Sequence, residues 1–481
     1  MTAQTTDSNS VGRATAAPAQ PLPHEVDYSG RIPLLILITC SVLWLLFSLF
    51  TGVFAAVKMH APGMFANVAA LTYGRVAAVS LSSFYYGFAS QAAIAIALWL
   101  FARLGKTFLI LPRGTIIAAL LWNLVLLLGI LGIFSGEMNQ FAGYQLPLWT
   151  APAFFVIFIV LGLSGILTYI ARTERDSYPS TWFLFTAFFA FAWLLTIAWL
   201  MLGHYPVRGI FQPIVATWYE NNFMNMWLAP VALAVVFYFV SKLSQQPLYS
   251  FNLAACGFWF YVAFAPASGF QNISAIPNWM PALSSVINVI LLLPAIAFGL
   301  NWYYTCSRQS KNKKIKDPSS KYMAFAAFAF LLGAFLTALI SCPLVDSVVG
   351  LTLFIPGVTQ WISYGFIAMA FFAAIIHIVP RLTETDWPSV KLLSGHYGLT
   401  VAGIVILVLG LTVGGLVQGQ AINDPAISSI QISKKVVPFI GVSTLGLLLL
   451  FLGQLALLLN LISMFKNACC CILPMNKEAA R

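Results

Sequence analysis

Charged side chains are scarce in this sequence. They make up 8% of its 481 residues, whereas 60% of the residues are hydrophobic. A soluble domain has roughly 25% charged residues. The composition therefore excludes an ordinary soluble fold and indicates a polytopic helical membrane protein. The net charge of +11 does not indicate nucleic-acid binding, because the basic residues gather in loops on one side of the predicted membrane domain.

The sequence also lacks the motifs of soluble catalytic and cofactor-binding domains. It has no P-loop and no GxGxxG after a strand. The absence of CxxC and CxxCH excludes zinc-finger spacing and covalent haem attachment. The seven cysteines are scattered, apart from one run that follows the last apolar segment; they are Cys40, Cys256, Cys306, Cys342 and Cys469–Cys471. Lipidation, metal binding and no role at all stay open for this run.

What the sequence does contain is a series of apolar segments long enough to cross a bilayer, which needs about 20 residues. Twelve such segments are predicted, within a membrane domain over residues 31–466 that lies between a disordered tail (1–30) and a short tail (467–481). They cover 33–57, 78–103, 112–134, 150–171, 181–203, 222–241, 252–268, 282–304, 322–341, 357–380, 397–419 and 437–465.

The distribution of lysine and arginine predicts the orientation. Twelve spans place both termini on one side, and 19 of the 24 basic residues lie on that side. The excess includes the run RQSKNKKIK at 308–316. Basic loops favour the cytoplasm, so we expect both termini to be cytoplasmic and the protein to lie in the inner membrane of a bacterium.

Several strings resemble subunit I of cbb-type cytochrome c oxidases, within the haem–copper oxidase superfamily. The strings are WYENNFMNMWLAPVALAVVFYFVSK (218–242), the segment 245–302 with its AIPNW, HIVPRL (377–382), GHYGLTVAGI (395–404), YGR (73–75) and GEMNQFAGYQLP (136–147). The resemblance implies an all-α bundle of about twelve transmembrane helices. It also implies an oxidoreductase activity and two haems and a copper held by six histidines.

The six histidine positions that the resemblance implies hold other residues in this sequence. The haem positions fall on Ser80, Val358 and Gln360, and the copper positions fall on Asn221, Gly269 and Phe270. The family's ligand-linked tyrosine falls on Ala263, and its helix-nine glutamate falls on Ser341.

The number of histidines leads to the same expectation without any alignment. The chain has five, one in the N-terminal tail and four predicted at the ends of spans; they are His24, His60, His204, His377 and His396. An intramembrane haem pair and copper site need imidazoles within the bilayer. We therefore expect no haem, no metal and no catalytic residue in this chain.

Three functions remain open at this stage. The first is a cofactor-free accessory or structural subunit that works beside haem-bearing cytochrome subunits or a catalytic paralogue. The second is a divergent terminal oxidase or nitric-oxide reductase with displaced ligands. The third is the binding of a quinone, a lipid or a solute in an emptied core.

The asparagines at 221, 222 and 225 allow two interpretations. Asn221 and Asn222 would cap the start of the sixth span, and Asn221 and Asn225 would share a face that bonds to a neighbouring helix. Alternatively, Asn221, Asn222, Asn225 and Gln360 would line a polar cavity.

Overall fold

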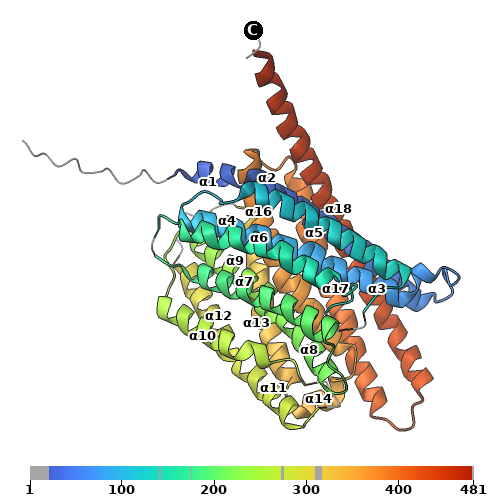
Figure 1. Cartoon of the computed structure of the whole chain (residues 1–481). Coiled ribbons are helices and arrows are strands. Elements are labelled where there is room, and N and C mark those ends of the chain that lie inside the picture. Colours follow the sequence, from blue (N-terminus) through green and yellow to red (C-terminus); the bar gives the residue numbers. More distant parts are fainter. Residues whose placement is uncertain are drawn as a thin grey trace, which may run out of the picture.

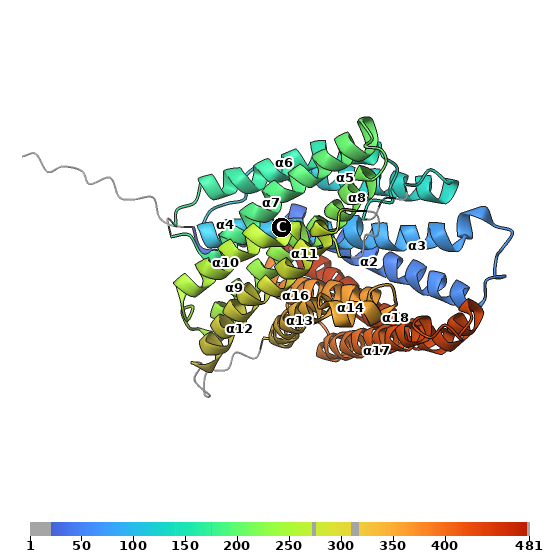
Figure 2. The ribbon, with the colours of Figure 1, turned by 90° about the horizontal axis from the view of Figure 1, so that it is seen from below.

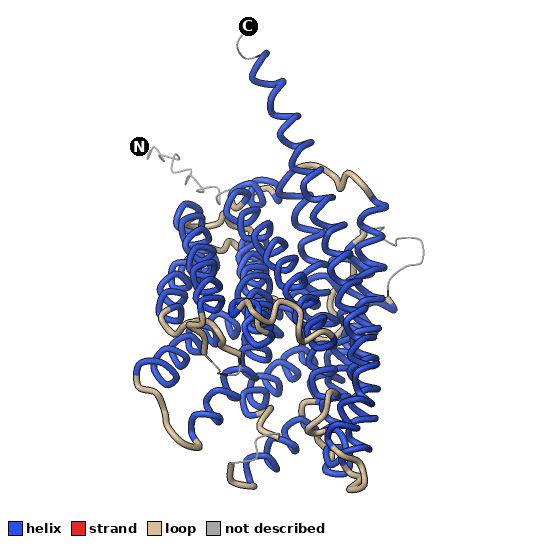
Figure 3. Tube along the Cα trace, turned by 90° about the vertical axis from the view of Figure 1, so that its right-hand side faces the viewer, coloured by secondary structure: helices blue, strands red, loops and turns tan. Residues whose placement is uncertain are grey.

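The computed structural model describes most of the chain and shows an all-helical bundle (Figure 3). The described residues are 21–139, 141, 143–174, 176–271, 276–308 and 317–478, with side chains up to Asn467. The side chains of Cys469–Cys471 and nearly all of the basic run at 308–316 fall outside this description.

The elements follow one another as helices joined by short loops. The first half comprises α1 Pro23–Ser29, α2 Arg31–His60, η1 Ala69–Leu71, α3 Tyr73–Ser82, η2 Ser83–Ala89, α4 Ser90–Gly105, α5 Pro112–Ser135, α6 Thr150–Ile170, α7 Pro179–Ile197, η3 Ala198–His204, α8 Phe211–Asn222, η4 Phe223–Leu228 and α9 Ala229–Ser244. The second half comprises α10 Phe251–Phe264, η5 Ala265–Ala267, α11 Trp279–Ile290, α12 Leu292–Ser307, α13 Ser319–Ile340, α14 Pro343–Val349, α15 Phe354–Gln360, η7 Trp361–Ala368, α16 Met369–Thr383, α17 Val390–Ile422 and α18 Ser429–Glu478.

The twelve predicted spans are confirmed as helices. Among the described residues, eleven helical stretches are long and apolar enough to cross a membrane, and the twelfth is the shorter apolar helix Phe251–Ala267. It stops early because Pro266 and Gly269 interrupt it, and Gly269 takes a φ of +91°. A positive φ of this kind favours glycine.

The sixth span begins earlier than predicted, and this changes the role of its asparagines. The helical stretch runs over Phe211–Ser244, so Asn221 and Asn222 lie inside it. The predicted capping role is therefore wrong, because the free backbone amides that a cap satisfies belong to the first turn, at Phe211.

Three spans form the centre of the bundle. Within an apolar 18-residue window of each stretch, 89% of the residues are buried for Tyr73–Gly105 and for Phe211–Ser244 and 94% for Phe354–Thr383, against 39–50% for the other eight long spans. Figure 2 shows two of their helices, α9 and α16, between α6 and α7 on one side and α17 on the other. A helix that is apolar on all sides suits such a position.

Each central span also contains a stretch of π-helix. These are η2, η4 and η7. π-helical turns are rare and widen the helix, and they occur frequently at functional sites. Here they place consecutive bulky side chains in the middle of the bundle.

Helix α1 and the far end of α18 lie at the same end of the bundle (Figure 1), as an even number of spans requires. The prediction of a disordered tail over residues 1–30 does not hold at its end, because residues 23–29 form α1. Buried Asp27 holds this helix by accepting hydrogen bonds from Trp99 Nε1 (2.9 Å) and Arg103 (3.3 Å). The predicted tail over 467–481 begins as a continuation of α18, which stays helical to Glu478.

Glycines bring α17 and α18 into backbone contact. A Cβ added at Gly410 would lie 2.8 Å from Ser443 N and 2.9 Å from Phe439 O, whereas one at Gly398 would meet nothing within 4 Å. Small residues allow this close approach between membrane helices.

This difference predicts opposite effects for two substitutions in one helix. Gly410→Ala should destabilise the protein by about 1–3 kcal/mol, because the added methyl overpacks the backbone contact. Gly398→Ala should be neutral or stabilising by up to about 1 kcal/mol, since alanine is the better helix former. Thermal unfolding of both variants in detergent measures this, and equal effects would contradict the backbone contact.

Candidate functional site

Aromatic side chains fill the place where the three central spans meet. Phe84 and Tyr85 of η2 pack against Tyr364 of η7 and Phe223 of η4, with ring centroids 4.9 Å and 5.4 Å apart. Phe223 also lies 5.1 Å from Tyr86. All five side chains are buried. Rings of this size contribute much of the packing energy of a core.

Tyr86 joins this aromatic centre to the helices around it. Its hydroxyl donates to Gly143 O at 3.0 Å, so the Tyr219 hydroxyl, at 2.7 Å, donates to Tyr86 Oη. The backbone carbonyl of Tyr86 accepts from Trp122 Nε1 at 2.9 Å, and its ring stacks on Phe154 at 5.6 Å. The polar groups of this buried residue are thus satisfied within the protein, as hydrocarbon surroundings require.

Asn221 stands at the centre of a hydrogen-bonded cluster near one end of the sixth span. Its Nδ2 donates to Ser268 Oγ at 3.2 Å, and its Oδ1 accepts from Asn225 Nδ2 at 2.9 Å. Asn222 Nδ2 donates to Pro266 O at 3.1 Å. Gly269 lies against this cluster, since a Cβ there would come within 2.5 Å of Asn221 Oδ1.

A second cluster continues from the same loop. The Phe270 amide donates to Ser284 Oγ at 3.0 Å. Gln271 Nε2 hydrogen-bonds with Ser341, whose Oγ also accepts from Asn288 Nδ2 at 3.2 Å. Ser341 is the residue that the sequence resemblance predicts at the family's helix-nine glutamate position. Amide and hydroxyl groups therefore tie the loop after η5 to α8, α11 and α13.

Asn221, Gly269 and Phe270, the residues that we expect at the copper positions, all belong to these neighbouring clusters. The residues that we expect at the haem positions have other surroundings. Ser80 exchanges hydrogen bonds with Ser48 of α2, at 2.8 Å and 2.7 Å. Val358 packs in a small apolar cluster with Ile340, Val349 and Phe354.

Gln360 is half-buried, and no hydrogen bond of its side chain occurs within the described ranges. The proposed polar cavity of Asn221, Asn222, Asn225 and Gln360 therefore stays a prediction; the three asparagines form hydrogen bonds with protein groups.

The histidines of the spans lie at helix ends and are engaged there. His396 is held between Tyr322 Oη (2.8 Å from Nδ1) and Gln454 Nε2 (3.1 Å from Nε2). His377 Nδ1 lies 2.9 Å from Asp317 Oδ2. His60 Nε2 is 3.4 Å from Thr444 Oγ1, and His204 packs against Trp199 and Tyr205.

The two buried histidines differ in how free their ring nitrogens are: His377 Nε2 has no hydrogen-bond partner among the described residues, whereas both ring nitrogens of His396 have one. Iron and copper sites in proteins use imidazole nitrogens whose second nitrogen is oriented by a hydrogen bond. Both ring nitrogens of His396 are already bonded to side chains, and aromatic rings occupy the meeting point of the central spans. In the part of the chain that the structure describes, no three histidine, cysteine, aspartate or glutamate side chains gather closely enough to hold a metal.

Most of the supporting residues could not be chosen from the sequence. Ser268, Gln271, Ser284 and Asn288 are ordinary polar residues, and only their scarcity in apolar spans singles them out. The pairing of His377 with Asp317, 60 residues apart, has no sequence signal because it depends on the approach of two helices.

The fold defines a polytopic membrane protein of the oxidase subunit I type. The chain belongs to the family described as Cytochrome C and Quinol oxidase polypeptide I, whose sequence pattern matches residues 33–449. Members of this family work in membrane complexes with other respiratory subunits.

Individual relatives are also oxidase subunit I proteins. The Cbb3-type cytochrome c oxidase subunit CcoN1 of Stutzerimonas stutzeri is 24% identical over 404 residues, which cover 80% of this chain and 83% of that protein. A cytochrome c oxidase subunit 1 homolog of Azorhizobium caulinodans is 23% identical over 472 residues, covering 93% and 84%. The similarity to cbb-type subunits agrees with the resemblance in the sequence.

Removing the asparagine cluster should lower the stability of the folded protein. Asn221→Ala should destabilise the protein by about 1–3 kcal/mol, because Asn225 loses its acceptor and Ser268 loses a partner in a buried region. Gln360→Ala removes a half-buried side chain without a described hydrogen bond and should cost about 0.5 kcal/mol or less. Denaturation of the two variants in one detergent provides the comparison; a larger loss for Gln360→Ala would exclude a structural role for the cluster.

Proposed function

We propose that this chain is a cofactor-free, non-catalytic accessory or structural subunit of a respiratory electron-transfer complex. The proposal rests on the expectation from the sequence resemblance that the six ligand positions of the family fall on Ser80, Val358, Gln360, Asn221, Gly269 and Phe270, none of which is a histidine. At the copper positions, Asn221, Gly269 and Phe270 take part in hydrogen bonds or close contacts with protein groups.

The packing of the interior supports the same function. An emptied core would leave a void, and membrane proteins gain no stability from unfilled space. Here Phe84, Tyr85 and Tyr86 occupy the middle of the bundle with partners on each side. Such a filled interior suits a protein that holds other subunits, and it leaves little room for quinone binding at the centre.

The partners that fit this proposal are haem-bearing cytochrome subunits or a catalytic paralogue in the same membrane. A subunit without its own redox centre has no route for electrons and contributes through its surfaces. The lipid-facing sides of the outer spans carry large apolar side chains, which contact either lipid or other membrane subunits.

The test is an absorption spectrum with haem extraction and iron and copper analysis of the singly purified chain in detergent. We expect no Soret band and less than about 0.1 metal per chain, in a preparation whose helical content and unfolding show that it is folded. A haem-loaded subunit I, purified in the same way, is the positive control. A Soret band with stoichiometric iron would overturn the proposal and restore the divergent-oxidase alternative.

The accessory role has a separate test. Affinity purification of the tagged chain from its native membrane should recover cytochrome subunits in a fixed ratio, and their haem should be absent from the chain expressed alone. Recovery of the chain without any respiratory subunit, under conditions that keep a known oxidase complex intact, would contradict this role.

A further inference from the structure

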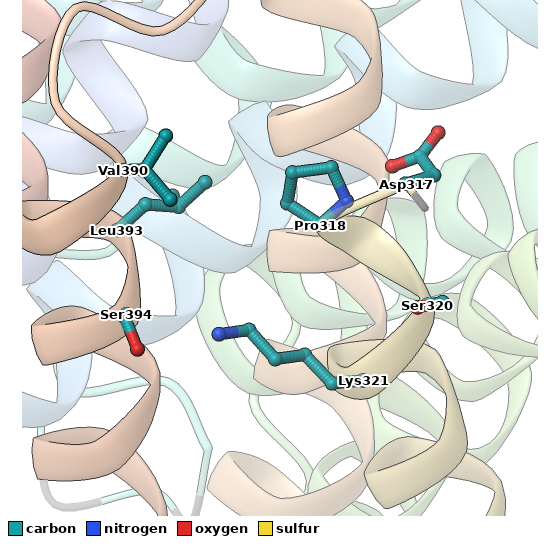
Figure 4. Close-up of a pocket in the computed structure, with 7 residues that line it drawn as sticks. All are labelled: Asp317, Pro318, Ser320, Lys321, Val390, Leu393 and Ser394. Carbon is teal, nitrogen blue, oxygen red and sulfur yellow. The ribbon is translucent and has the colours of Figure 1, made fainter. Parts of the chain in front are cut away.

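A cavity of about 270 Å³ lies at the starts of α13 and α17. It lies between the first turns of α13 and α17 and is lined by Asp317, Pro318, Ser320, Lys321, Val390, Leu393 and Ser394 (Figure 4). None of these residues belongs to the former ligand positions. The cavity is therefore separate from the asparagine cluster and from the aromatic centre.

Lys321 gives this cavity a positive charge. Figure 4 shows its side chain extending across the opening toward Leu393 and Ser394. Its Nζ lies 4.6 Å from the ring centre of Tyr397 and 5.8 Å from that of Tyr322. The ion pairs found among the described residues involve other cations. The two rings hold the ammonium in place while leaving it open to an anion.

Asp317, the acidic residue of the lining, already binds other groups of the protein. Asp317 Oδ1 accepts hydrogen bonds from the Ser319 amide (2.9 Å) and hydroxyl (2.6 Å), and Oδ2 faces His377 Nδ1 at 2.9 Å. Burial alone would raise the pKa of Asp317, but these hydrogen bonds outweigh it and lower that pKa. The carboxylate thus binds Ser319, the first residue of α13, and His377, and in Figure 4 it points away from Lys321.

The remaining lining suits a phosphate group attached to an apolar body. Ser320 and Ser394 are the hydroxyl residues of the lining, which comes from the first turns of two long helices, whose N-terminal ends carry partial positive charge. Val390, which is 73% exposed, adds an apolar edge. Tyrosines and lysines at the ends of spans are typical of the membrane–water interface, where phospholipid headgroups lie.

We infer that this cavity binds the headgroup phosphate of an anionic phospholipid, with Lys321 as the main cation and the two serine hydroxyls as donors. The acyl chains would then leave past Val390 and run along α13 and α17. Such a lipid would fasten the start of α13 to α17. The inference is independent of whether the chain carries a cofactor.

Native mass spectrometry of the full chain in detergent tests this site with three probes: phosphatidylglycerol, phosphatidylcholine and inorganic phosphate. We expect phosphatidylglycerol to bind and Lys321→Gln to weaken that binding about fivefold, the effect of one lysine near an anionic lipid. Lys321→Arg should retain it. Lys391→Gln is the matched control, because Lys391 is an exposed lysine in the first turn of α17 that does not line the cavity.

The outcomes separate the possible sources of phosphate. Equal binding by wild type and Lys321→Gln, or equal losses for the Lys321 and Lys391 variants, would overturn the site. Lys321-dependent binding of inorganic phosphate at the same concentration would overturn the lipid as its source. Ser394→Phe is a second variant, at an exposed position; it should block the cavity without removing the charge, and unchanged lipid binding in it would count against the proposal.

Discussion

The packing of aromatic rings at the meeting point of three central helices is the interaction on which this structure depends. The interior of a helical bundle must be filled, since voids forgo dispersion contacts on every side. Here η2, η4 and η7 supply rings from three directions, and Tyr86 ties them to α5, α6 and α8. The outer spans pack around this centre and keep their exposed sides for lipid.

The membrane interior places a second constraint on the structure, which is that buried polar groups need hydrogen-bond partners. Within hydrocarbon, an amide or hydroxyl that loses its partner raises the free energy of the folded state. Next to the interrupted seventh span, the side chains of Asn221, Asn225 and Ser268 hydrogen-bond to one another. Asn222 donates to the carbonyl of Pro266, so that these hydrogen bonds hold the break in the helix.

Periodicity and composition could predict the membrane class and the twelve spans, because apolar length is a local property of the sequence. The errors in the predicted helix boundaries arose because only local sequence was used. The sixth span was predicted from residue 222, since Glu220 and the asparagines look like an end, yet the helix continues from Phe211. Helix α1 was missed because its stability comes from Asp27 meeting Trp99 and Arg103, more than 70 residues away.

For the candidate site, the residues expected at the family's ligand positions stay a prediction, and the sequence did not show what those residues contact. The i, i+4 spacing of Asn221 and Asn225 indicated a shared face, and the two side chains do bond to each other and to the neighbouring helix end. Ser80 could not be placed in this way, because its partner Ser48 is on another helix. Neither could the cavity beside Lys321, which exists only where two distant helix starts meet.

The most direct test of the central claim is an experimental map of the chain in a lipid nanodisc, at a resolution that shows side chains. The account predicts ring densities for Phe84 and Tyr364 with centroids about 5 Å apart, and continuous density between the hydroxyls of Tyr86 and Tyr219. A planar macrocycle at the meeting point of η2, η4 and η7, with these rings turned aside, would contradict it.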